Sequence, residues 1–364
     1  MNLTAILQAM EDFAPLQDQE PWDNTGLLVG SPDMDITGVM VSLDPTREVL
    51  REALEMGCNL IVSHHPLLFQ GVKRFTPVCP EYDIIREAIR HDIAIVAMHT
   101  NLDNQLTGIN HVWASRLALQ QLAILKPQRG RVKKLVTFSP QGFASSIREA
   151  LFRVGGGHIG KYDSCSFSVE GNGTFRGSSD SQPFVGKPLE LHTEREERIE
   201  VVFPDYLEGL IIRQLRSSHP YEEVAFDIYS LDNCLPYVGA GIIGELQKPV
   251  KKQDFLMMVK EVFDAKVLRI SRCRKEDVSM VAICSGSGAD LIPDAMAAGA
   301  DAFLTGDLKY HTFQREGQEM VLVDIGHYES EMVVKQVVYA ILKEKFPTFA
   351  VFISEQEQNP IIYL

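Results

Sequence analysis

Short apolar runs alternate with amphipathic segments through the first third of the chain. Residues 39–43 and 59–62 are predicted to be buried strands. Between them, residues 46–56 repeat their apolar positions at helical spacing, and a second such segment over 82–90 leads to a strand at 93–97. This β-α-β alternation predicts a mostly parallel sheet with right-handed crossovers. In such a sheet, polar residues just beyond the carboxyl ends of the strands line the ligand crevice.

The same alternation returns in the last third of the chain. The apolar runs predicted to be strands there are 280–284, 302–307, 321–326 and 350–353. Because the first and last thirds of the chain share one pattern, residues 1–125 and 241–364 are predicted to form a single discontinuous α/β body of two or three layers.

A different pattern occupies the middle of the chain, from residue 126 to residue 240. A basic, punctuated stretch at 127–134 marks its start, and the segments that follow have the order β-α-β-β-α-β of a ferredoxin-like α+β insert. The glycines at 155–157 lack the Lys-Ser or Lys-Thr of a phosphate loop, so we interpret them as a flexible turn. His158 and His219 are expected to serve local structure or an inter-subunit contact.

Composition narrows the possible partners. A chain of 364 residues is long enough for two or three domains, and its formal net charge of -14 disfavours a polyanion. We therefore expect no broad nucleic-acid surface, although a nucleotide held by metal ions stays possible. Six cysteines without a CxxC pair indicate reduced thiols. With no signal-like N-terminus and no run long enough for a bilayer, a cytoplasmic protein without a membrane partner is expected.

Two adjacent histidines, His64 and His65, follow the strand at 59–62. Pro66 favours an extended backbone at His65, so the two rings are predicted to leave the chain on opposite sides, which suits two metal ions better than one. The alternative is one structural and one solvated histidine. In the loop before the first strand, Trp22 and Asp23 are expected to form a turn that buries the indole, and the alternative is that both serve as a lid or orient the ligands of the site.

Further donors follow other predicted strands on the same rim of the sheet. His327 and Glu331 lie four positions apart at a helix start and face the same way. The proposed ligands are His64, His65, Asp103, His327 and Glu331. Nitrogen and carboxylate donors without thiolate suit zinc, iron(II) or manganese. Five donors fit two divalent ions, with Asp103 or Glu331 as the bridge. Residues that could orient these ligands, or equally cap helices or face solvent, are His99, Asp307 and His311.

Four motifs together resemble the GTP cyclohydrolase 1 type 2 homologues, also called Nif-three-like proteins. They are Ser63-His64-His65-Pro66-Leu67, His99-Thr100-Asn101-Leu102-Asp103, Thr305-Gly306-Asp307 and Gly326-His327-Tyr328-Glu329-Ser330-Glu331. The resemblance covers the whole chain and implies a two-metal centre on the same five ligands. It also implies a PII-like or CutA-like insert and a toroidal homohexamer whose metal sites face an internal cavity.

Two functions are compatible with these residues. The first is a metal-dependent hydrolase that acts on a nucleotide or phosphoester through metal-bound hydroxide, since no serine nucleophile elbow and no cysteine–histidine pair is evident near the strand ends. The second is a metal-binding regulatory or chaperone protein without turnover, in which the insert senses or docks a partner.

Overall fold

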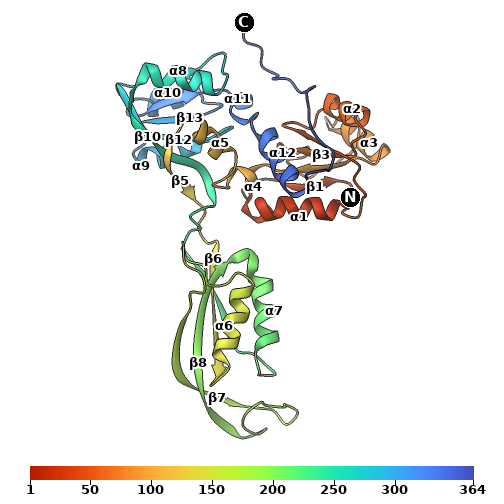
Figure 1. Ribbon diagram of the computed structural model, residues 1–364, viewed down its shortest axis with the longest axis vertical. Helices are drawn as coiled ribbons and strands as arrows, with labels where there is room; N and C mark the ends of the chain where they lie inside the picture. Colours follow the sequence, from red (N-terminus) through yellow and green to blue (C-terminus); the bar gives the residue numbers. More distant parts are fainter. Residues whose placement is uncertain (80) are drawn as a thin grey trace. The chain divides into compact units, whose positions relative to one another are not determined.

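The computed structural model describes residues 1–79 and 81–364 (Figure 1). The chain divides into two compact units. We call the unit formed by Met1–Lys126 and Tyr237–Leu364 the body, and Pro127–Pro236 the insert. Helices and strands are interleaved throughout, which confirms the mixed α/β class expected from the sequence.

The body contains two sheets, where the sequence predicted one. The first has the strand order β1-β4-β3-β2-β15, in which β4, β3, β2 and β15 run parallel and β1 is antiparallel. Its strands are β1 (Gly26–Val29), β2 (Val39–Ser42), β3 (Leu60–Ser63), β4 (Ala94–Ala97) and β15 (Val351–Ile353). The helices that pack on it are α1 (Leu3–Phe13), α2 (Arg47–Glu55), α3 (Tyr82–Arg90) and α12 (Val334–Lys345). After β4 come α4 (Thr100–Asp103) and α5 (Ile109–Arg116), which contact strands of the second sheet. The end of the chain thus returns to the sheet that the beginning builds.

The second sheet has the order β11-β14-β13-β12-β10-β5, with β12, β13 and β14 parallel at its centre. Its strands are β5 (Gln120–Pro127), β10 (Gly239–Lys251), β11 (Arg269–Ile270), β12 (Asp277–Ile283), β13 (Ala302–Thr305) and β14 (Val321–Asp324). Its helices are α8 (Lys252–Val262), α9 (Ile292–Ala297), α10 (Tyr310–Glu316) and α11 (His327–Glu331). Each sheet therefore has its own parallel core and its own row of carboxyl ends.

Helices cover both faces of the first sheet, which is why its central strands are continuous apolar runs. On β2, Val39 and Val41 pack with α1 and α12, whereas Met40 between them packs with α2. Helix α2 begins at Thr46, whose side chain accepts a hydrogen bond from Val49 N, and it is followed by Gly57 at φ +71°. That left-handed residue ends the helix as the sequence predicted.

A shared apolar layer joins the two sheets of the body. It contains residues of β3 and β4 together with residues of β12, β13 and β14. Trp113 on α5 is fully enclosed there, stacked on Phe263 with ring centroids 4.0 Å apart. Its Nε1 donates a hydrogen bond to Ser330 O at 2.6 Å. The first half of the chain thereby fixes helix α11, which carries two of the proposed ligands.

The insert folds around a separate core. Its sheet has the order β7-β8-β6-β9 with antiparallel neighbours, and helices α6 and α7 cover one face. The elements are β6 (Val132–Pro140), α6 (Ala144–Arg153), β7 (Phe167–Arg176), β8 (Leu191–Pro204), α7 (Glu208–Ser218) and β9 (Phe226–Leu231). Leu135, Ile147 and Ile199 are at the centre of this core. The PII-like or CutA-like relationship of the insert stays a prediction.

Candidate metal centre

Three strand ends of the body deliver imidazoles and carboxylates to one place. His64 and His65 follow β3, His99 and Asp103 lie at the start and end of α4 after β4, and His327 and Glu331 lie on α11 after β14. The first two groups come from one sheet and the third from the other. All five proposed ligands are linked by donor distances below 4 Å.

Glu331 is the centre of this cluster. Its Oε1 lies 3.8 Å from His64 Nε2, which in turn lies 3.6 Å from Asp103 Oδ1. Its Oε2 lies 3.0 Å from both His65 Nε2 and His327 Nε2. The donor atoms therefore fall into two sets of three, and each set includes one oxygen of the same carboxylate. Such sharing is the arrangement a bridging ligand requires.

Several of these atoms are buried without a hydrogen-bond partner. They include His64 Nε2 and Asp103 Oδ1. A buried polar atom left unpaired costs about 1–3 kcal/mol, so native proteins rarely tolerate a group of them unless a ligand satisfies them. A nitrogen and oxygen donor set without sulfur fits zinc, iron(II) or manganese. The residues present thus fit divalent metal ions.

Outer contacts direct each imidazole toward the cluster. His64 Nδ1 lies 2.7 Å from Met98 O, which leaves Nε2 free to bind an ion. The other two rings are held by carboxylates: His65 Nδ1 lies 2.8 Å from Asp44 Oδ1, and His327 Nδ1 lies 2.7 Å from Asp307 Oδ2. Asp307 has the orienting contact expected from the sequence. Asp44 was missed, because in Asp44-Pro45-Thr46 it looks like an ordinary strand-ending residue.

The pKa values of the two carboxylates in the cluster are shifted in opposite directions. Burial and the nearby Glu331 carboxylate raise the pKa of Asp103 well above its usual value. Burial also opposes ionisation of Glu331, but the nearby His327, His64 and His65 imidazoles outweigh it and hold the pKa of Glu331 well below the usual range. Glu331 is thus the permanent anion of the site.

The pKa values of the three imidazoles are also shifted in different directions. Burial lowers the pKa of His64, which has a backbone carbonyl on its outer nitrogen. For His65, burial is outweighed by Asp44 and Glu331, which raise the pKa to about 10. Glu331 and Asp307 raise the pKa of His327 to about 9. Carboxylate partners thus make the His65–His327 set the more basic one, a property that strengthens metal binding.

Two sequence-based expectations about rings are wrong. The rings of His64 and His65 lie side by side, with centroids 5.3 Å apart, because β3 ends at Ser63 and the chain bends there, so strand alternation no longer applies. Trp22 was expected to be buried, yet it is 61% exposed. Its ring meets His99 edge-on with centroids 5.9 Å apart, and the half-exposed Phe69 does the same at 5.7 Å.

His99 lies closer to the centre than expected. Its donor atoms and those of His64 and His65 lie within 4.8 Å of one another, as do those of His65, His327 and Glu331. Its Nδ1 lies 2.8 Å from Asp23 Oδ1, and the His99 and Thr100 contacts lower the pKa of Asp23 to about 2 against the effect of burial. His99 is therefore placed as a possible further ligand, held by Asp23.

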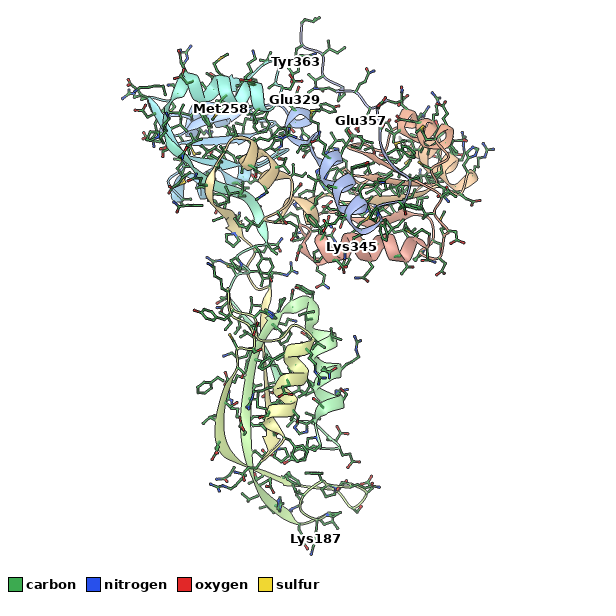
Figure 2. The ribbon with its side chains drawn as sticks, viewed as in Figure 1. Lys187, Met258, Glu329, Lys345, Glu357 and Tyr363 are labelled. Carbon is green, nitrogen blue, oxygen red and sulfur yellow. The ribbon has the colours of Figure 1, made fainter. Side chains whose placement is uncertain are left out.

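The remaining predicted residue, His311, lies on α10 and is exposed, with Nδ1 3.3 Å from Gln314 Oε1. Glu329, labelled in Figure 2, lies on α11 but turns from the cluster: its Oε1 accepts a hydrogen bond from Asn359 Nδ2 at 2.8 Å. This agrees with ranking Glu331 above Glu329 as a ligand. No helix within residues 1–79 and 81–364 is long and apolar enough to span a membrane.

Comparison with known proteins identifies the family. The model of Duf34/NIF3 (NGG1p interacting factor 3) matches residues 1–360. The chain belongs to the DUF34/NIF3 family. Among NIF3-family relatives, the GTP cyclohydrolase 1 type 2 homolog of Bacillus subtilis is 35% identical, with 100% of this chain and 99% of the relative covered. The homolog of Halalkalibacterium halodurans is 33% identical at the same coverage.

Solved structures agree with this family assignment. A Bacillus cereus protein related to NIF3 matches with a TM-score of 0.86 and 35% identity, covering 100% of this chain and 99% of the other. A Staphylococcus aureus protein matches with a TM-score of 0.79 and 29% identity over the same shares. The fold of the whole chain is therefore that of the NIF3 family.

Proposed function

We propose that this NIF3-family protein is a hydrolase that uses two divalent metal ions to act on a nucleotide or related phosphoester. The observation that carries the proposal is the division of the donors into two sets that share Glu331. When bound, a pair of divalent ions lowers the pKa of a water molecule and polarises the bond to be broken. The homohexamer implied by the family resemblance is part of the proposal.

The protein side chains have distinct tasks in this proposal. Glu331 would hold both ions, and its low pKa keeps it ionised. Asp44 and Asp307 fix the rings of His65 and His327, so that set should bind its ion more tightly. The other set, His64 with Asp103, has no carboxylate behind its ring and should release its ion first.

Two exposed aromatic rings support a nucleotide as substrate. Trp22 and Phe69 lie beside His99 and are 61% and 49% exposed, so both rings are accessible to a planar ring close to the cluster. Stacking of one base on an aromatic side chain contributes about 1–3 kcal/mol. Phosphate oxygens bind divalent cations well, which would overcome the repulsion expected from an acidic protein.

The test is turnover by the full-length protein loaded with zinc, iron(II) or manganese, against a panel of nucleotides and phosphoesters. We expect hydrolysis of a nucleotide with at least one metal. Glu331→Gln should remove both bound metal and turnover. Trp22→Ala should keep the metal content but raise KM roughly 5- to 100-fold, the range of one lost stacking contact.

A matched control is Glu344→Gln on the outer turn of α12, which should change neither metal content nor rate. Full metal loading without turnover of any member of the panel would contradict the hydrolase. That result would favour the second candidate, a metal-binding regulatory or chaperone protein without turnover. One observation supports this alternative: the insert has a hydrophobic core of its own, as a sensing or docking domain would need.

A further inference from the structure

The insert contains a cavity of about 690 Å³ that the proposed function does not use. All of its lining residues belong to the insert. Its wall is formed by residues of β6, β7 and β8, of the loop between β7 and β8, and of the segment that follows α7. Its volume is within the range of sites that hold small organic molecules.

Aromatic rings form much of the wall. Tyr221 is central: its ring centroid lies 6.4 Å from that of Phe175 and 6.2 Å from that of Phe184. The three come from different segments, since Phe175 is on β7, Phe184 is in the loop between β7 and β8, and Tyr221 follows α7. Rings from three directions around one space can each present a face to a cation.

The polar part of the wall is acidic. Four glutamates line the cavity: Glu170, Glu196, Glu222 and Glu223. Arg198 is the one basic residue among the described lining residues, and its guanidinium is already paired with Glu200 at 2.8 Å. The cavity therefore has an excess of negative charge that no lining cation balances.

Glu196 is fixed in place at the wall. Its Oε1 accepts a hydrogen bond from the Tyr221 hydroxyl at 2.8 Å. On β7, Gly173 lies two residues beyond Gly171, the register partner of Glu196, and a Cβ added at Gly173 would lie 2.1 Å from Glu196 Oε2. Glycine inside a strand marks a close approach of another group, and here that group is the Glu196 carboxylate. The absence of a side chain at Gly173 thus leaves space for the Glu196 carboxylate beside the aromatic rings.

We propose that this cavity binds an organic cation, an ammonium or guanidinium compound with an apolar body. Aromatic faces attract such a cation by about 0.5–2 kcal/mol each, and the Glu196 carboxylate supplies the counter-charge. An anion of the same size would face four carboxylates. A neutral molecule would leave the half-buried Glu196 carboxylate without a counter-charge. The site is independent of the metal centre, because no proposed metal ligand belongs to the insert.

The test uses the full-length protein and three probes of similar size: benzyltrimethylammonium, benzyl alcohol and benzoate. Isothermal titration calorimetry should show binding of the cation at least tenfold tighter than that of the other two. Glu196→Gln, which keeps the hydrogen bond from Tyr221, should weaken cation binding about tenfold. Phe184→Ala should weaken it severalfold. Glu149→Gln on the exposed side of α6 is the control and should bind as the parent does.

Three results would overturn the proposal. One is no binding of any probe, the second is equal binding of benzyl alcohol or benzoate, and the third is unchanged cation affinity in Glu196→Gln. Because the variants lie in the insert, their metal content should stay at the parent value. A test of the metal hydrolase can therefore fail without affecting this one.

Discussion

Two glutamates, Glu331 in the body and Glu196 in the insert, show how differently the two units use a carboxylate. Glu331 is almost fully buried, with three imidazole nitrogens within 4 Å of its two oxygens. Glu196 is half-buried beside aromatic rings, with one oxygen held by a tyrosine hydroxyl. The first environment suits a small ion that coordinates lone pairs, and the second suits a large cation that packs against rings.

The two sites also differ in how the chain assembles them. The body takes its donors from positions as distant as His64 and Glu331, and they meet only when both sheets have packed on their shared layer. The insert builds its cavity between Phe138 and Ala225, within a unit with its own core. We therefore expect ligands of the two sites to stabilise different units.

The largest expected effect is on the body. In differential scanning calorimetry, metal at 100 times its dissociation constant should stabilise the body by about 2.7 kcal/mol per ion, and a chelator should reverse this. The transition assigned to the insert should stay where it is. Glu331→Gln should abolish the metal-dependent shift and Glu196→Gln should preserve it. An equal shift of both transitions would show that the contrast between the units is wrong.

Much of the proposed metal centre could be predicted because strand ends are visible in the sequence. His64, Asp103 and His327 each follow an apolar run, and parallel strands bring such ends to one edge. The body's division into two sheets was not predictable from pattern alone. Strand β15 shows why: its three residues pair with β2, more than three hundred positions earlier, and no local signal encodes that partner.

The orienting residues were harder to predict than the ligands. Asp44 and Asp23 occupy turn sequences in which aspartate is common for local reasons, so their contacts with His65 and His99 depend on tertiary structure. The burial predicted for Trp22 was wrong, because tryptophan side chains are usually buried and the sequence does not indicate the exception. The exposure of Trp22 beside His99 is the observation on which the proposed stacking of a base depends.

A smaller effect should separate function from stability at Asp103. Burial and the Glu331 carboxylate raise its pKa, so its charged form destabilises the metal-free fold at neutral pH. Asp103→Asn should therefore stabilise metal-free protein by about 1 kcal/mol at pH 7 while it weakens metal binding.

The size of this effect depends on pH. The native pKa lies above the unfolded value of about 3.9, so the parent loses stability as pH rises from that value toward the native pKa. The advantage of the variant should consequently vanish near pH 4. Urea unfolding of the metal-free proteins at both pH values measures it. A variant less stable than the parent at pH 7 would contradict the repulsion between Asp103 and Glu331.

The smallest effect concerns His219 in the insert, which holds the segment that carries Tyr221. Its Nε2 donates to Phe138 O at 2.9 Å and its Nδ1 accepts from Tyr221 N at 3.1 Å, so only the neutral ring satisfies both contacts. Burial lowers its pKa, against a weaker opposite effect of the Glu196 carboxylate. Protonation would place a second N–H against the Tyr221 amide and remove one hydrogen bond.

Because the native pKa of His219 lies below the unfolded value of about 6.5, its contribution is present above that pH and is lost as pH falls through the native pKa. We expect the insert to lose on the order of 0.5–1 kcal/mol below pH 6, the value of one neutral hydrogen bond. His219→Gln should flatten this dependence in urea unfolding, whereas His158→Gln, at an exposed position, should retain it. If the two variants behave alike, the pH response comes from elsewhere. Affinity for benzyltrimethylammonium should fall over the same pH range in the parent protein, because the ring of Tyr221 moves with the segment that His219 holds.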